Sequence, residues 1–461
     1  MRFETAALLC ASSLLSACPG GVLTLDTGID DEAYCHGELA VSLHDRIATV
    51  LVVEWSQRVP SEATAVEFRF DGGDWQSSPP AALPIGPASE VVLGVPQDTE
   101  VEVRLANHPT GATCDDRPGV TARTGLLPGR LPEPTVIEWD PALASPEGYL
   151  LYSMDVNARN YYDGPYYTVI VDRAGHIVWY RPSGWGRTTM YPRVGKNGGY
   201  ILLDESTAYT WTGESGDLFR LTLDLAHEDS MPIPGFAYSF DELPDGTILR
   251  DQIDYLQWEY RIVEQAFGEP EDLVWRCNRW QPGLSSSCYS NTVNWVQSTD
   301  TILWSMVMLN TVLEIDRTTG EVVHQWGDYD GSSAISPPEA GFDFQHYPSY
   351  TPDGTLLVSV HGHGDHGPEQ RAREYAITES GQLEQVWSYG QGVDEYAMYS
   401  GEAYRLTNGN TLIGYGTGGA LREVTADGQV AWDLDWGQPL LVGHATLVED
   451  LYALNTGPAG R

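Results

Sequence analysis

Two short phrases alternate along most of the chain, and this repetition restricts the possible folds more than any other feature. The first phrase is a turn followed by an apolar strand that often ends in Trp. It occurs at 174-AGHIVW-179, 215-SGDLFRL-221, 270-PEDLVW-275, 319-TGEVVHQW-326, 380-SGQLEQVW-387 and 427-DGQVAW-432. The second phrase, again a turn before a strand, occurs at 197-NGGYIL-202, 245-DGTIL-249, 300-DTIL-303, 353-DGTLL-357, 408-NGNTLI-413 and 449-EDLYAL-454. Intervals of roughly 45–60 residues match one four-stranded propeller blade with its loops.

One structural unit used six times explains both phrases. We therefore predict an all-β chain with a six-bladed β-propeller over residues 137–461, in which radial repetition protects the edges of the sheets. A long sandwich or a solenoid is the alternative, but neither requires six similar units. Amphipathic helical periods of useful length are absent from the sequence.

Residues 35–124 have a different pattern. The segments 50-VLVVEW-55, 66-VEFRF-70 and 101-VEVRL-105 are apolar or alternate apolar with polar residues, as strands do. Short connections that carry Pro and Gly separate them. This pattern predicts a small β-sandwich of immunoglobulin or fibronectin III type over 35–124, followed by a linker over 125–136 whose prolines do not fit inside a sheet.

The first residues indicate export. Residues 1–17 combine a short charged start with an apolar run that is too short to span a bilayer, as in secretory signal peptides. The segment Leu15 to Cys18 resembles the lipobox of bacterial lipoproteins. That resemblance implies cleavage before Cys18, lipidation of this residue, and a protein anchored in the cell envelope, facing the periplasm or the outside, with residues 18–34 as a flexible tether. An uncleaved membrane anchor is the alternative.

Cysteine usage agrees with export. If Cys10 leaves with the signal peptide and Cys18 carries lipid, four cysteines remain, and an oxidising compartment would pair them. Four cysteines allow three pairings. Proximity in the sequence favours Cys35 with Cys114 and Cys277 with Cys288.

The charge balance excludes one class of partner. The 461 residues include 65 acidic and 25 basic side chains, which gives a formal net charge of −40, and the acidic residues are scattered over the sequence. Such a field repels nucleic acid and anionic membrane surfaces, so we expect no nucleic-acid partner and membrane contact through the lipid alone. An anionic substrate would need locally placed cations.

The strand nearest the axis of a propeller delivers side chains into a central funnel. Alignment of the six copies of the second phrase places equivalent positions just upstream of it, namely Tyr191, Tyr238, Asn291 or Thr292, His346, Gly401, and Gly443 or His444. Three further residues fall within two positions of this ring: Tyr289, Gln345 and Ser400. A funnel lined by tyrosines, an amide and histidines suits an aromatic ligand with polar contacts at one end.

Four segments within residues 148–436 resemble the bacterial arylsulfotransferases, a family of six-bladed propellers. They are 311-TVLEIDRTTGEVVHQWG-327, 344-FQHYPSYTPDGTLL-357, 371-RAREY-375 and, most specific, 406-LTNGNTLIGYGTGGALREVTADGQVAW-432. The resemblance implies transfer of a sulfuryl group from an aryl sulfate ester to a phenolic acceptor, through a sulfated histidine and without a nucleotide donor. It implies no required cofactor.

The resemblance also implies roles for two residues. His346 matches one of the active-site histidines of the family, and Arg371 matches its sulfate-binding arginine, whose fork of N–H donors suits an oxyanion. The alternative for His346 is a structural histidine that holds inner strands together by hydrogen bonds.

The pattern departs from the family at two earlier inner strands. Where the family has histidines, Tyr238 and Tyr289 stand in this chain, and Asn291 is retained beside the second. Tyrosine is a poor base near neutral pH because its pKa lies near 10. His444, one residue from the ring position in the last repeat, is our own candidate for the missing histidine.

A histidine-rich stretch, 360-VHGHGDHGPEQR-371, invites a metal-binding interpretation. His361, His363, Asp365 and His366 resemble the metal motif of the metallo-β-lactamase superfamily. The chain lacks the alternating helices and strands of that superfamily, so a metal-dependent hydrolase is the least favoured hypothesis. We expect a solvated turn whose histidines point outward, and a bound divalent metal ion is the alternative.

Two functional hypotheses follow from the sequence. The first is an exported arylsulfotransferase-like enzyme with His346, Arg371 and His444 as catalytic residues. Its substrate-binding residues would be Tyr191, Tyr238, Tyr289, Asn291, Thr292 and Ser400. The second is a catalytically inactive propeller that binds an aromatic or anionic ligand at the cell surface.

Overall fold

The computed structural model describes residues 33–111, 113–157, 164–207, 216–284, 287–364, 367–393, 395–438 and 440–458, and for residues 363, 364 and 367 it describes the backbone alone. This part of the chain is all-β: apart from the four-residue helix α1 (Cys277–Trp280) and single 3₁₀ turns, its regular elements are strands. No helix within it is long and apolar enough to span a membrane. The expected signal peptide and Cys18 lie outside the described residues.

The N-terminal unit consists of two antiparallel sheets. One contains β1 (Ala40–Leu43), β2 (Leu51–Gln57) and β6 (Gly86–Val92). The other contains β3 (Ser61–Phe70), β4 (Gln76–Ser77), β5 (Ala81–Leu83), β7 (Glu100–Pro109) and β8 (Val120–Arg123). Alternate side chains of β2, such as Val53 and Trp55, pack against Val66, Phe68 and Val103 from the second sheet. The strands predicted around 50–55, 66–70 and 101–105 are therefore confirmed.

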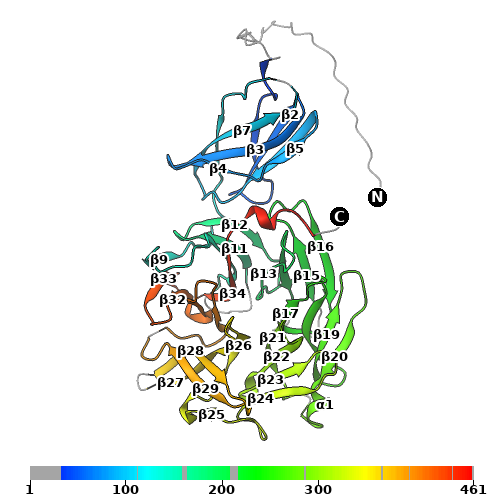
Figure 1. Cartoon of the computed structure of the whole chain (residues 1–461), viewed down its shortest axis with the longest axis vertical. Helices are drawn as coiled ribbons and strands as arrows, with labels where there is room; N and C mark the ends of the chain where they lie inside the picture. The colour runs from blue at the N-terminus through cyan, green and yellow to red at the C-terminus, as the bar shows by residue number, and fades with distance from the viewer. Residues whose placement is uncertain are drawn as a thin grey trace, which may run out of the picture.

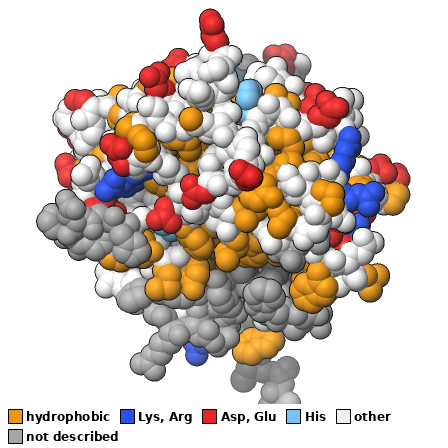
Figure 2. Space-filling model, turned by 90° about the horizontal axis from the view of Figure 1, so that it is seen from below, with side chains coloured by type: hydrophobic (Ala, Val, Ile, Leu, Met, Phe, Trp, Pro, Cys, Tyr) orange, Lys and Arg blue, Asp and Glu red, His pale blue; other side chains and the backbone are white. Residues whose placement is uncertain are grey.

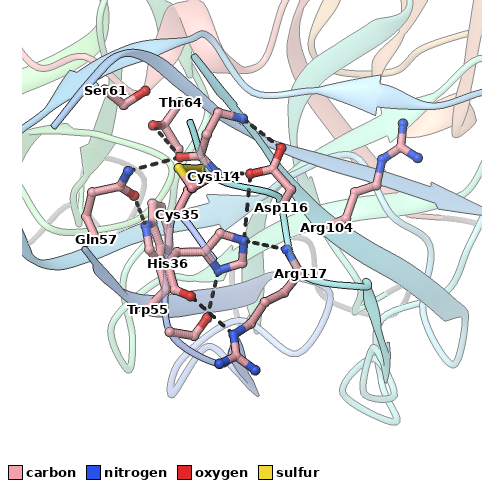
Figure 3. A network of polar contacts seen from close by, with 12 residues as sticks. Cys35, His36, Trp55, Gln57, Ser61, Thr64, Arg104, Cys114, Asp116 and Arg117 are labelled. Carbon is pink, nitrogen blue, oxygen red and sulfur yellow. Dashed lines mark hydrogen bonds and ion pairs between the residues drawn. A yellow bond between two sulfur atoms is a disulfide. The ribbon is translucent and has the colours of Figure 1, made fainter. Parts of the chain in front are cut away.

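A disulfide and a buried histidine join the ends of this unit (Figure 3). Cys35 is bonded to Cys114. The next residue, His36, is fully buried: its Nδ1 donates to the carbonyl of Gly37 at 2.7 Å, so its Nε2 accepts from the backbone N–H of Arg117 at 3.3 Å. Burial lowers the pKa of His36, which keeps the ring neutral. The second predicted disulfide, Cys277–Cys288, is also present, and two disulfides are typical of a protein that folds outside the cytoplasm.

Six further antiparallel sheets lie among the described residues, between Thr135 and Val448, and surround a common centre (Figure 1). In chain order, the first sheet contains β10 (Tyr149–Asp155), β11 (Tyr166–Asp172) and β12 (Ile177–Pro182). The second contains β13 (Arg193–Val194), β14 (Ile201–Glu205), β15 (Gly216–Leu221) and β16 (Glu228–Ile233). The third contains β17 (Phe236–Glu242), β18 (Ile248–Asp254), β19 (Glu259–Gln265) and β20 (Asp272–Arg276).

The remaining three sheets continue the same order. The fourth contains β21 (Ser290–Val296), β22 (Thr301–Met306), β23 (Thr311–Asp316) and β24 (Val322–Gly327). The fifth contains β26 (His346–Tyr350), β27 (Leu356–Gly364), β28 (Gly367–Ile377) and β29 (Leu383–Tyr389), with the short β25 (Ile335–Ser336). The sixth contains β30 (Gly401–Arg405), β31 (Thr411–Tyr415), β32 (Ala420–Val424) and β33 (Val430–Asp435). The arrangement is propeller-like, and the strand nearest the centre is one end strand of each sheet, namely β34 (Leu441–Val448), β13, β17, β21, β26 or β30.

The two ends of this unit close the ring. The last strand, β34 (Leu441–Val448), pairs with β10 and supplies the inner strand of the first sheet. The first strand, β9 (Thr135–Trp139), pairs with β33 at the outer edge of the last sheet. Strand β9 thus begins inside the segment predicted as a linker. Because both ends are paired in sheets, the ring has no free end to unravel from.

Two copies of the repeated phrases differ from the others in their place. Residues 216–221 form β15, the third strand of its sheet, and the outer strand is β16, which lacks the Trp phrase. Residues 449–454 form no strand, since Tyr452–Leu454 is a 3₁₀ turn. The reason is ring closure: β34 already pairs with β10 from the start of the unit, so no second strand is needed after it.

The N-terminal unit packs directly on the ring. Ile47, Val50 and Leu93 belong to the same apolar cluster as residues of β10 to β12. Hydrogen bonds add to this contact: the hydroxyl of Tyr180 accepts from the backbone N–H of Ala48 at 3.1 Å. Figure 2 views the molecule from the side away from this contact, and there Asp and Glu side chains are spread over the face with few Lys and Arg between them.

Candidate functional site

The predicted ring positions occur where the chain enters the inner strands. Tyr191 lies two residues before β13, and the others belong to or begin β17, β21, β26, β30 and β34. All are buried: Tyr191, Tyr238, Asn291, Thr292, His346, Gly401, Gly443 and His444. The chain crosses here from the outer strand of one sheet to the inner strand of the next, so equivalent side chains reach the centre at one level.

Carboxylates fix the backbone at two of these entries. Asp204 of β14 accepts hydrogen bonds from the backbone N–H groups of Met190 and Tyr191, the shorter at 2.8 Å. In the next sheet, Oδ1 of Asp251 accepts from the N–H groups of Tyr238 at 2.7 Å and Ser239 at 3.0 Å. Burial raises the pKa of each aspartate to about 7. We therefore assign both aspartates a structural role, since they hold the backbone at the start of the inner strands.

The raised pKa of Asp251 makes stability depend on pH. Between about pH 4 and 7 the unfolded chain loses the Asp251 proton while the folded chain keeps it, so stability falls as the pH rises. We expect Asp251→Asn, which keeps the Oδ1 acceptor, to raise the unfolding midpoint at pH 8 by several degrees, with a smaller rise at pH 5. The matched variant Asp251→Ala loses the acceptor and should lower the midpoint at both pH values. Equal midpoints for parent and Asn variant at pH 8 would contradict this expectation.

His346 pairs with a histidine from the histidine-rich stretch. Its ring stacks on that of His361, with centroids 4.8 Å apart, and both residues are at least 96% buried. Among the described residues, Nε2 of His346 and both ring nitrogens of His361 have no hydrogen-bond partner. Burial lowers the pKa of His361 to about 4 and that of His346 well below its usual value, where the neighbouring His361 contributes. Both rings are therefore neutral at physiological pH.

The structure corrects the expectation for the histidine-rich stretch. Strand β27 continues past Val360 to Gly364 and pairs with β28, so His361 lies inside a strand and points inward rather than out of a solvated turn. The side chains of His363, Asp365 and His366 lie outside the described residues. Within those described, no group of three or more His, Cys, Asp or Glu side chains could hold a metal ion.

Arg371 does not join His346. It pairs with Glu369, whose Oε2 accepts from Arg371 Nε at 2.8 Å. In the β27–β28 register His361 faces Gln370. Because neighbouring residues on a strand point to opposite faces, Arg371 lies on the face of β28 opposite to Gln370 and His361.

The other predicted substrate-binding residues make mainly structural contacts. The hydroxyl of Tyr191 donates to the carbonyl of Asn291 at 3.1 Å, and that of Tyr238 bonds Ser400 Oγ at 3.1 Å. Thr292 Oγ1 accepts from a backbone N–H and also donates to a carbonyl. Tyr289 packs edge-on against Tyr260 of β19, with ring centroids 5.5 Å apart, so it is not part of the ring.

His444 is held by a carboxylate. Its Nδ1 lies 2.6 Å from Oε2 of Glu402 on β30, and Oε1 of the same carboxylate accepts from the N–H of Ala445 at 2.7 Å. The side chains of His444 and Glu402 are only 3% and 8% exposed. The imidazole stacks on Tyr347, with centroids 5.0 Å apart. A buried carboxylate at Nδ1 fixes the tautomer and makes Nε2 the basic nitrogen.

A cavity of about 210 Å³ opens beside this pair. It is several times the roughly 30 Å³ that one water molecule occupies in the liquid, so it has room for a small ligand. Its lining combines aromatic, cationic and acidic side chains: Arg193, Val194, Lys196, Asp241, Glu242, Tyr347, Tyr404, His444 and Thr446. We place the candidate site at His444 because its cavity combines a carboxylate-bound histidine with cations; a larger cavity of about 490 Å³ near residues 129–132 has Arg130 as its one ionisable lining residue among those described.

Two cations reach this cavity. Lys196 Nζ lies 3.0 Å from Asp241 and 4.6 Å from the centre of the Trp295 ring. Arg193 donates to Asn294 at 3.1 Å and to the hydroxyl of Tyr347 at 3.5 Å. Both therefore keep N–H donors for a ligand, since Arg has five and Lys three.

Most of these lining residues were not predicted from the sequence. Arg193, Tyr404 and Thr446 lie two positions beyond Tyr191, Glu402 and His444, respectively, and period-two alternation along an inner strand places such pairs on one side. This alternation is the sequence signal from which Arg193, Tyr404 and Thr446 could have been predicted. Nothing local indicated Glu402, because its partner is 42 residues away in another sheet.

Comparisons with known proteins show only distant structural similarity. No family model and no curated protein matches the chain. Among solved structures, a protein of unknown function from Bacteroides caccae is 16% identical, with 66% of this chain and 100% of that one covered and a TM-score of 0.46. A streptogramin B lyase is 16% identical over 65% and 87% of the two chains, with a TM-score of 0.37. A putative 6-phosphogluconolactonase from Bacteroides fragilis is 13% identical over 83% and 98%, with a TM-score of 0.39.

Proposed function

We propose that this chain is a six-bladed β-propeller enzyme with an immunoglobulin- or fibronectin III-like N-terminal sandwich, and that it transfers a sulfuryl group from an aryl sulfate ester to a phenol. The six sheets closed by β9 and β34 support the blade count. The two facing antiparallel sheets of the N-terminal unit support the sandwich. We place the reaction in the cavity beside His444.

One observation carries the proposal: a carboxylate-bound histidine faces a cavity that has both aromatic walls and cations. Tyr347 and Tyr404 offer ring faces to an aryl group. Arg193 and Lys196 offer N–H donors to the sulfate oxygens, which supplies the local positive charge that an anionic substrate needs in so acidic a protein.

The chemistry follows from these groups. Transfer requires removal of a proton from the attacking hydroxyl and its return to the departing phenolate. His444 can do both at neutral pH, because Glu402 stabilises the imidazolium that forms in between. The cations stabilise the charge that shifts onto oxygen in the transition state.

The experiment is an assay of the soluble, lipid-free protein with its disulfides formed. We expect phenolate release from 4-nitrophenyl sulfate that depends on an added phenol, and loss of release on the order of 10²-fold or more in His444→Ala. Loss in His346→Gln together with full activity in His444→Ala would move the site to the His346–His361 pair. Absence of release across a panel of aryl sulfates from folded protein would exclude the transferase for those donors.

A second function, ligand binding without turnover, is favoured by one observation. The two residues that the family resemblance implies for sulfate, His346 and Arg371, are engaged with His361 and Glu369 on opposite faces of a sheet. In that case an aromatic sulfate would bind in the same cavity, and calorimetry would detect it where the assay detects no product.

We also propose that the protein is an exported lipoprotein of the cell envelope, anchored through Cys18. The disulfides support an oxidising compartment. Fractionation tests the anchor, since Cys18→Ser should release the protein from the membrane fraction, and retention there would contradict it.

A further inference from the structure

Both ring nitrogens of His444 are engaged. Nδ1 lies 2.6 Å from Oε2 of Glu402, and Nε2 lies 3.0 Å from Oγ1 of Thr446. A carboxylate only accepts, so Nδ1 carries the proton and donates it to Glu402. Nε2 is then an acceptor, and the hydroxyl of Thr446 donates to it. Hydroxyl, imidazole and carboxylate form one chain of hydrogen bonds.

This order of groups is the one that activates a hydroxyl nucleophile. A base at hydrogen-bond distance removes the hydroxyl proton, and a third group orients the base. His444 and Thr446 are two residues apart on β34, so both side chains project from one face of the strand. The alignment therefore follows from the strand itself, with Glu402 supplied by β30 next to it.

His444 and Thr446 both line the cavity, and the more exposed of the two is Thr446. It lines the space together with Arg193 and Lys196 and is partly exposed, whereas His444 and Glu402 are buried. The hydroxyls of Tyr347 and Tyr404 also line it. Each of these hydroxyls accepts an N–H in the structure, from Arg193 and Leu447, so its own hydrogen is available to a ligand oxygen.

We propose that Oγ1 of Thr446 receives the sulfuryl group and that His444 is its base. This inference rests on the proposed function and names its covalent intermediate. The Nε2 lone pair that His444 would need to attack sulfur accepts the hydrogen bond from the Thr446 hydroxyl, and Thr446 is the more exposed of the two residues.

Each half-reaction balances without a further reactant. In the first, a bond forms between Oγ1 and sulfur, the Oγ1 proton passes to Nε2 of His444, and the bond between sulfur and the phenolic oxygen breaks. The phenolate takes the proton from Nε2, which leaves a phenol and a sulfate ester of Thr446. In the second, an acceptor phenol gives its proton to Nε2 and attacks the sulfur, and Oγ1 leaves and regains the proton.

The test is mass spectrometry of the whole protein after incubation with 4-nitrophenyl sulfate without acceptor. We expect a mass increase of one SO₃ group, placed on Thr446 by fragmentation and removed when phenol is added. Thr446→Val keeps the shape and removes the hydroxyl, so we expect no added mass and a loss of phenolate release of about 10³-fold or more. Thr446→Ser restores the hydroxyl and should restore the added mass.

The outcomes separate this inference from the function on which it rests. Added mass on His444, or Thr446→Val that still releases phenolate at the parent rate, would overturn the inference and leave the proposed function standing. No release by the parent protein would overturn both. Should Thr446→Val fail to fold, as judged by its unfolding transition, the site of the mass on the parent protein and the Ser variant decide the question.

Discussion

Replacement of Glu402 by Gln should lower sulfuryl transfer by about 10³-fold or more with little change in the fold, because it reverses the tautomer of His444. The amide oxygen can still accept from the N–H of Ala445, as Oε1 does now at 2.7 Å. The amide NH₂ then faces Nδ1 as a donor, so the proton of the neutral ring moves to Nε2. A protonated Nε2 cannot accept from Thr446, and the base is lost.

Three measurements make this result specific. Glu379→Gln, at an exposed carboxylate outside the cavity beside His444, removes the same charge and should leave the rate unchanged. The unfolding midpoint of Glu402→Gln should stay within a few degrees of the parent. The rate should fall through kcat with KM little changed, since Glu402 acts on the base and touches no ligand. A parent-like kcat in Glu402→Gln would remove His444 from the mechanism.

The sheets were predictable because five of the repeats contain the same local pairing. A turn before a pair of Ile or Leu residues marks the second strand of five sheets, and its antiparallel partner lies a nearly constant distance upstream. That offset placed Tyr191, Tyr238 and His346 at equivalent entries. The sixth copy was misleading because closure depends on which strand β34 meets, and its partner β10 is nearly 300 residues earlier.

The site was less predictable because its contacts cross between sheets. His444 could be placed near the centre by the repeat offset, but Glu402 reaches it from a neighbouring sheet, and no local pattern encodes that approach. The position of Arg371 was not predictable from the sequence for another reason. Its face is decided by the register of the β27–β28 hairpin, and a shift of one residue in that hairpin would turn Arg371 toward His361.

The local sequence pattern did not predict the packing of His361 either. The sequence around it is rich in Gly and polar residues, which is typical of a turn. The strand continues because β28 pairs with β27 along its whole length and because Gly401 leaves room: a Cβ there would lie 2.5 Å from His361 Nε2. The histidine is accommodated by the absence of a side chain in another sheet.

A chain that ends at Leu440 should lose its cooperative unfolding transition, because β34 is the strand that closes the ring. Strand β34 fills the position next to β10 and buries Leu441, Val442, Ala445 and Val448. Burial of one such side chain contributes roughly 1.5–3 kcal/mol, and the total stability of a domain is about 5–15 kcal/mol. Loss of the strand also exposes the edge of β10 and opens the ring.

Complementation in trans gives this prediction its sharpest form. A peptide of residues 441–458 carries β34 together with His444 and Thr446, and its addition to the truncated chain should restore the transition and phenolate release together. The same peptide with Thr446→Val should restore the transition alone, because closure needs the strand and transfer needs the hydroxyl. A shuffled peptide of equal composition should restore neither. If the truncated chain unfolds like the parent without any peptide, β34 does not hold the ring closed.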